Sequence, residues 1–164
     1  MKIVVFADSH TDVSTMLDVV RAERPDVVLH LGDHLADGLE LQNRVDIAVH
    51  LVKGNTDQAD EGKTDALLEI EHVRVWMTHG HLFKVENGLT TLYDGGARAG
   101  AQIVLFGHTH RPHLSYRDGI WLMNPGRVGR ISSKAIHATY GVIRLADRTI
   151  RCAISEVPSC GGCL

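Results

Sequence analysis

The sequence has too few cysteines for a disulfide framework, with three in 164 residues. It also lacks an apolar run long enough to cross a bilayer. We expect no signal peptide at the amino terminus, because Asp8 interrupts the first apolar segment too early. These absences exclude a disulfide-rich secreted protein and a membrane-spanning protein, and we expect a cytoplasmic protein in a reducing compartment.

The chain also lacks an excess of basic residues over acidic ones. The net charge is -3, the isoelectric point is about 6.4, and no block of Lys or Arg marks a surface for nucleic acid. Apolar residues make up 44% of the chain and charged residues 23%, as in an ordinary soluble globular domain.

We expect a single domain over residues 1–155 and a flexible Cys/Gly tail over 156–164. The alternative for Cys160 and Cys163 is adventitious metal binding, and Cys152 is expected to be a small core residue.

Hydrophobic periodicity predicts an α/β fold with strands that alternate with helices. Strands are predicted at residues 3–7, 26–31, 46–52, 67–70, 73–77, 102–106, 113–116, 120–123, 139–145 and 149–154. Helices are predicted at residues 12–24, 35–43 and 87–99. Asp12 or Thr11 is the expected cap of the first helix, and Pro25 is its expected stop.

Five of the buried strands run into a polar turn that carries Asp, Asn or His. These residues are Asp8, His10, Asp33, Asn55, His79, His108 and His110. Because ligands collect at the carboxyl ends of strands in open α/β sheets, the seven side chains are expected to meet in one site. Each short motif alone is common in turns, and it is their shared placement that indicates a site.

Oxygen donors and imidazoles together suit a divalent transition metal such as manganese, iron or zinc. Seven ligands are too many for one ion. They divide naturally if Asp33 bridges two ions about 3.5 to 4 Å apart, which is the spacing in two-metal phosphatases and nucleases.

The ordered motifs resemble the signature of calcineurin-like metallophosphoesterases, in particular their small single-domain bacterial and archaeal phosphodiesterase branch. The matching segments are Asp8-x-His10, Gly32-Asp33, Gly54-Asn55-x-Asp57, His79-Gly80-His81, Gly107-His108-x-His110, Asn124-Pro125-Gly126 and Thr139-Tyr140-Gly141-Val142-Ile143. The resemblance covers nearly the whole chain. It implies a four-layer α-β-β-α sandwich, with two mixed β-sheets flanked by helices.

The resemblance also implies a ligand set and a reaction. The first ion would be held by Asp8, His10, Asp33 and His110, and the second by Asp33, Asn55, His79 and His108. Mn²⁺ is favoured, with Fe, Zn, Ni or Co as other candidates. A hydroxide that bridges the ions would attack a small phosphate ester in line. The expected catalytic residues are Asp33, Asn55, His79 and His81, Asp57 would orient a neighbouring ligand, and the family often forms dimers or larger homo-oligomers.

One position departs from the family pattern. Phosphatase branches commonly carry His where this chain has Thr56, and Thr cannot protonate a leaving group at neutral pH. His81 and His34 are the candidates for an alternative acid. Candidate phosphate contacts are Lys53, Arg127 and Arg130.

Two other functions are compatible with such a fold. The retromer subunit that shares it is a protein-interaction scaffold, but scaffolds of this kind tend to lose ligands and this chain has every expected one. DNA-repair nucleases use the same metal pair, but they carry DNA-binding segments for which this chain has neither length nor basic charge. A phosphodiesterase is therefore the leading hypothesis.

Overall fold

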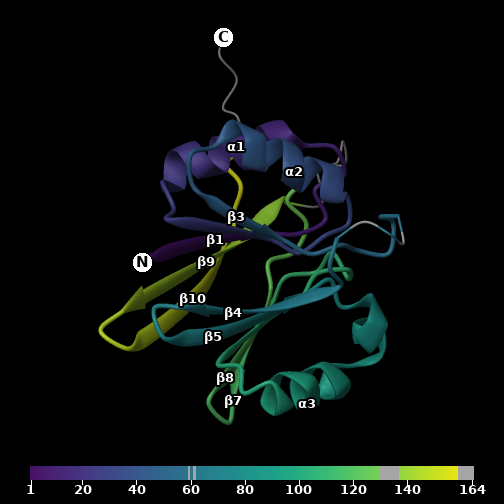
Figure 1. Ribbon diagram of the computed structural model, residues 1–164, viewed down its shortest axis with the longest axis vertical. Coiled ribbons are helices and arrows are strands. Elements are labelled where there is room, and N and C mark those ends of the chain that lie inside the picture. Colours follow the sequence, from purple (N-terminus) through teal and green to yellow (C-terminus); the bar gives the residue numbers. More distant parts are fainter. Residues whose placement is uncertain (59, 61, 130–136, 159–164) are drawn as a thin grey trace.

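The computed structural model describes residues 1–58, 60, 62–129 and 137–158. Within them the chain forms two mixed five-stranded sheets and three α-helices, as the sequence predicted (Figure 1). The elements in order are β1 (Lys2–Phe6), α1 (Val13–Glu23), β2 (Val27–His30), α2 (Leu35–Arg44), β3 (Ala48–Leu51), β4 (Asp65–Ile70), β5 (Val73–Thr78), the 3₁₀ turns η1 (His81–Phe83) and η2 (Val85–Asn87), α3 (Thr90–Arg98), β6 (Ile103–Leu105), β7 (His113–Arg117), β8 (Ile120–Asn124), β9 (Thr139–Ala146) and β10 (Thr149–Glu156).

Each sheet contains a parallel centre with antiparallel neighbours. The first has the order β10-β9-β1-β2-β3, in which β1, β2 and β3 are parallel. The second has the order β4-β5-β6-β8-β7, in which β5, β6 and β8 are parallel. The parallel strands of each sheet therefore end at one edge, where the polar turns follow.

The four layers arise from strands that are buried on both faces. Along β1, Ile3 and Val5 pack between the two sheets, whereas Val4 and Phe6 pack against helices α1 and α2. The outer face of the second sheet packs in the same way beneath α3, so helices cover both outer faces (Figure 1). This arrangement confirms the predicted α-β-β-α sandwich and explains the continuous apolar runs.

Several boundaries differ from the prediction. Helix α3 begins at Thr90 rather than at residue 87, because η1 and η2 come first and Lys84 and Gly88 adopt positive φ values of 50° and 141°. Strand β10 continues to Glu156, which the sequence assigned to the tail, because Glu156 pairs with Thr139. Residues 159–164, with Cys160 and Cys163, lie outside the described residues.

Cys152 confirms its predicted place, since it is half-buried and packs against the core between the sheets. Burial raises the pKa of its thiol to about 12.

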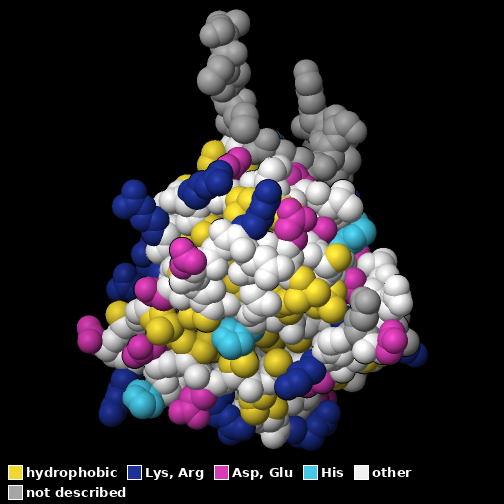
Figure 2. Space-filling model, turned by 45° about the horizontal axis from the view of Figure 1, so that its top comes forward, with side chains coloured by type: hydrophobic (Ala, Val, Ile, Leu, Met, Phe, Trp, Pro, Cys, Tyr) yellow, Lys and Arg dark blue, Asp and Glu magenta, His cyan; other side chains and the backbone are white. Residues whose placement is uncertain are grey.

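No helix in the described part of the chain is long and apolar enough to span a membrane. On the face shown in Figure 2, basic and acidic side chains are interspersed, in keeping with the small net charge.

Candidate metal centre

The seven predicted ligand residues all follow the carboxyl ends of parallel strands. Asp8 and His10 follow β1, Asp33 follows β2, Asn55 follows β3, His79 follows β5, and His108 and His110 follow β6. Ring contacts across the two sheets show that their edges meet, because His10 lies 5.0 Å from His110 between ring centroids. The structure therefore brings the carboxyl ends of the parallel strands of both sheets to one site.

Four of these residues form a compact group. The ligand atoms of Asp8, His10, Asp33 and His110 all lie within 4.8 Å of one another. His10 Nε2 lies 3.4 Å from His110 Nε2, and His110 Nε2 lies 3.4 Å from Asp8 Oδ1. Two carboxylates and two imidazoles at this spacing are a donor set for one divalent transition metal.

Asp33 also faces the remaining ligands. Its Oδ2 lies 3.8 Å from His10 Nε2, whereas its Oδ1 lies 3.9 Å from His79 Nε2. His79 Nε2 is 3.1 Å from Asn55 Oδ1, and the His79 and His108 ring centroids are 5.2 Å apart. The Asp33 carboxylate thus lies between the Asp8–His10–His110 cluster and the His79 side chain.

The Asp8 carboxylate gives a direct test of whether these residues fit a cation. Its side chain is fully buried, yet neither oxygen has a hydrogen-bond partner among the described residues. A buried carboxylate without such partners is costly unless a cation compensates its charge. The site therefore fits a metal ion, and the buried Asp/His cluster is a metal-ligand cluster.

Metal binding requires neutral imidazole rings, and the lowered pKa values of His79 and His10 favour that state. Burial is the main cause that lowers the pKa of His79 and of His10, and the positive charge of Arg127 lowers the pKa of His10 further. His79 Nδ1 donates to the Leu31 carbonyl at 2.9 Å, so Nε2 keeps its lone pair for a ligand. The pKa of His110 is raised, chiefly by the Asp8 carboxylate beside it.

The ligand-bearing turns are conformationally strained. Five of the seven residues have positive φ angles: Asp8 at 54°, His10 at 45°, Asp33 at 60°, His108 at 69° and His110 at 56°. This region costs residues other than glycine on the order of 1–3 kcal/mol each. Strain of this kind concentrates at functional sites, where the surrounding structure holds side chains in place.

Asp57 supports the site through the backbone and not through a ligand side chain. Its Oδ1 accepts from the His34 and Leu35 amides at 3.2 and 2.6 Å, and its Oδ2 accepts from the Gly54 amide at 2.8 Å. One carboxylate thereby joins the loop of Asp33 to the loop of Asn55. Glycine is needed at position 54, because a Cβ there would lie 2.5 Å from the Asp33 amide nitrogen.

Thr56 takes a role that its sequence position did not indicate. Its hydroxyl donates to Asp33 Oδ1 at 2.5 Å. Burial acts to raise the pKa of Asp33, but this hydrogen bond and the nearby His79 and His10 outweigh it, so the pKa is lowered. Thr56 therefore helps keep the central carboxylate ionised.

The other predicted residues lie around the centre. The His34 ring contacts the His10 ring at an interplanar angle of 60°, with ring centroids 5.2 Å apart. His81 lies 5.4 Å from His79 and 6.2 Å from His108 by the same measure. The half-buried Arg127 donates from Nε to the Gly129 carbonyl at 3.0 Å. Lys53 is also half-buried, in the loop of Asn55. Arg130 lies outside the described residues.

Four residues have supporting roles that the sequence did not assign, although Asn124 stands in one of the matched segments. Buried Asn124 donates from Nδ2 to the Gly107 carbonyl at 2.8 Å and so holds the loop of His108. Ser9 donates to Asp37 Oδ2 at 2.6 Å, and His30 Nε2 lies 3.2 Å from the same hydroxyl. Burial lowers the pKa of His30 to about 4. These contacts join residues 17 to 28 positions apart, and no local pattern announces them.

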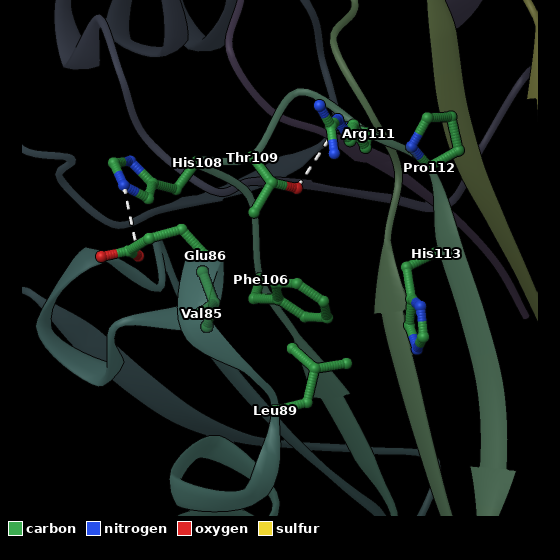
Figure 3. Close-up of a pocket in the computed structure, with 9 residues that line it drawn as sticks. All are labelled: Val85, Glu86, Leu89, Phe106, His108, Thr109, Arg111, Pro112 and His113. Atoms are coloured by element: carbon green, nitrogen blue, oxygen red, sulfur yellow. Dashed lines mark hydrogen bonds and ion pairs between the residues drawn. The ribbon is translucent and has the colours of Figure 1, made fainter.

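A pocket opens beside His108, with a volume of about 570 Å³ (Figure 3). We call it the His108 pocket and define it by His108, Glu86, Leu89, Phe106, Arg111 and His113, which all line it. Glu86 Oε2 lies 3.8 Å from His108 Nε2 at its mouth. The pocket thus adjoins the side chains of His108 and His79.

Comparisons with known proteins agree with this geometry. Residues 1–148 match the family model described as the calcineurin-like phosphoesterase superfamily domain. The probable metallophosphoesterase YsnB of Bacillus subtilis is 31% identical over 144 residues, which cover 83% of each chain. Phosphodiesterase YfcE of Escherichia coli is 30% identical, covering 94% of this chain and 88% of YfcE. The structure of a predicted phosphoesterase from Streptococcus pneumoniae superposes with a TM-score of 0.80 at 25% identity, covering 94% of this chain and 88% of that one. The chain therefore belongs to the calcineurin-like phosphoesterase superfamily and is related to its small bacterial phosphoesterases.

Proposed function

We propose that this protein is a metal-dependent phosphodiesterase that hydrolyses small phosphate esters at a centre for two divalent ions, with Mn²⁺ favoured. The observation that carries the proposal is the buried Asp8 carboxylate, which has no hydrogen-bond partner among the described residues and lies in a cluster with Asp33, His10 and His110. The name of YfcE, a phosphodiesterase, supports the preference for diesters.

The chain's residues divide the work in this proposal. Asp8, His10, Asp33 and His110 hold the first ion, and Asp33, Asn55, His79 and His108 hold the second. Bound divalent ions would attract the phosphate, polarise its oxygens and lower the pKa of water. The protein then needs no nucleophile of its own.

Arg127 is the strongest candidate for a phosphate contact from the protein. Its positive charge lies close enough to His10 and His110 to lower the pKa of both rings, after the larger effects of burial and of Asp8. A guanidinium can hold a phosphate by two parallel hydrogen bonds. Lys53 and Arg130 stay predictions from the sequence.

Protonation of the leaving group is assigned to His81, with His34 as the alternative. Burial and the neighbouring His79 and His108 lower the pKa of His81, so it carries little positive charge at neutral pH. We therefore expect a preference for leaving groups that need little protonation. His81→Ala should slow poor leaving groups more than good ones, whereas equal slowing would transfer the role to His34, whose Ala variant is the matched comparison.

The direct test uses paired chromogenic phosphodiester and phosphomonoester substrates with chelator-stripped protein, before and after manganese is added. Turnover that depends on manganese and favours the diester supports the proposal. No turnover with several divalent metals, despite two bound ions per chain, would favour the scaffold function instead. The complete ligand set argues against a scaffold, and the small acidic net charge argues against a nuclease.

A further inference from the structure

The His108 pocket is built differently on its floor and at its mouth. The floor belongs to the apolar layer beneath α3, where Phe106 is 2% exposed. Figure 3 shows the Phe106 ring and the His113 ring beside the same opening, with Leu89 next to them. The two ring centroids are 6.0 Å apart. Phe106 is therefore almost wholly covered, and the half-buried Leu89 and His113 supply the accessible surface of this floor, which suits a flat apolar group.

The mouth carries charge of both signs. Glu86 is half exposed and faces His108, so its carboxylate disfavours a second anionic group at the entrance. Arg111 is exposed on the rim, and a planar guanidinium can stack on the face of a ring. An occupant that reaches the floor from His108 should therefore be uncharged and flat where it passes Glu86.

Position connects the pocket to the proposed chemistry. His108 belongs to the pocket and also to the ligand group around His79, from which it lies 5.2 Å between ring centroids. A phosphate bound at that group would present one of its ester substituents to the pocket. A volume of about 570 Å³ lies within the usual range for small-molecule sites.

We propose that the His108 pocket binds an uncharged aromatic or heteroaromatic ester substituent, such as an aryl group or a nucleobase, of the phosphodiester substrate. This inference rests on the proposed phosphodiesterase function and adds the substrate class. Leu89 and His113 supply the surface that contacts the ring, the buried Phe106 packs against His113, and Glu86 selects against a further phosphate.

Phosphonates test the pocket apart from turnover, because their carbon–phosphorus bond is not an ester. Each carries one organic substituent, so the comparison of phenylphosphonate with methylphosphonate isolates the ring. Binding to the manganese-loaded protein is measured by calorimetry. We expect phenylphosphonate to bind at least about 10-fold more tightly, the discrimination typical of a hydrophobic pocket.

Two leucine variants provide a matched comparison. Leu89→Gln keeps the side-chain size but removes apolar contact, so it should reduce the preference for phenylphosphonate and leave methylphosphonate binding unchanged. Leu82 lies in η1 with 61% exposure and does not line the pocket, so Leu82→Gln should keep the preference. The His113 ring resonances should also shift with phenylphosphonate and not with methylphosphonate, a readout that needs no variant.

The outcomes separate the two proposals. Equal binding of the two phosphonates, or a His113 ring that does not respond to phenylphosphonate, would overturn the pocket assignment and leave the phosphodiesterase proposal standing. Failure of both phosphonates to bind, together with no hydrolysis of any diester, would overturn both.

Discussion

Removal of the Asp57 carboxylate should loosen the metal centre although Asp57 contacts no ligand side chain. Its two oxygens accept three backbone hydrogen bonds, from His34, Leu35 and Gly54. The amino terminus of α2 has no side-chain cap of its own, so Asp57 performs that task from another loop. Asp57→Ala leaves three amides without this acceptor, at a cost of roughly 1 kcal/mol each and about 3 kcal/mol in all.

The Asp57→Ala variant should still fold despite this loss, because domains are stable by about 5–15 kcal/mol. For a chain of this length the loss corresponds to a fall in Tm of about 6–12 °C. Metal affinity should fall about 10- to 100-fold, since the two joined loops carry Asp33 and Asn55. Asp57→Asn keeps one carbonyl oxygen and should lose about half as much stability.

Thermal unfolding and calorimetric manganese titration measure both effects. The matched control is Asp46→Ala, which removes an exposed carboxylate just before β3 and should shift Tm by no more than about 2 °C. The reasoning would be refuted if Asp57→Ala matched the control in Tm and metal affinity. A fall in Tm with unchanged metal affinity would mean that Asp57 caps α2 but does not support metal binding.

Three further predictions concern single side chains. Thr56→Val removes the hydroxyl that donates to Asp33 and should weaken manganese binding about 10-fold. Thr56→Ser keeps a hydroxyl and should bind manganese as the wild type does. Equal manganese affinity in the two variants would contradict a role for this hydrogen bond. Asp8→Asn should raise the unfolding free energy of the metal-free protein by about 1–2 kcal/mol, because it removes a buried charge whose oxygens have no hydrogen-bond partner among the described residues and whose only ion-pair partner among them is His110, at 3.4 Å. It should also abolish stabilisation by metal. A less stable metal-free variant in urea unfolding would count against this. Lys2 lowers the pKa of Glu23 below its ordinary value of 4.5, so their contact stabilises the fold fully above that pH and is lost as the pH falls through the lowered pKa. Glu23→Gln should therefore make the unfolding free energy less dependent on pH in this acidic range. An unchanged pH dependence in the variant would refute this prediction.

Much of the fold was predictable because local patterns and burial agree. The run Ile3 to Ala7 sends alternate side chains to two different cores, which is why it reads as continuously apolar. Asp12 caps α1 by accepting from the Thr15 amide, one of the two caps that the sequence offered. The 3₁₀ turns before α3 were missed, because they carry no apolar period.

The ligand residues were predictable for a different reason, namely that each stands in the turn after a parallel strand. The sequence predicted all five of these strands to be buried, but β3, before Asn55, is an edge strand with Ala48 and His50 exposed. The geometry of the ligand residues was not predictable. Asp8 and Asp33 have positive φ angles, and their turns make contacts with distant parts of the chain that the local sequence does not show. The Ser9–Asp37 hydrogen bond is such a contact, since it depends on how α2 packs beside the β1 loop.

The central claim is that Asp33 joins two metal-binding groups in one site. Calorimetric titration of metal-stripped protein with Mn²⁺ tests it most directly, with wild type, His108→Ala and Asp33→Ala compared. The account predicts two ions per chain for wild type, one for His108→Ala and no tight binding for Asp33→Ala. A single ion in wild type, or two ions retained after loss of His108, would contradict it.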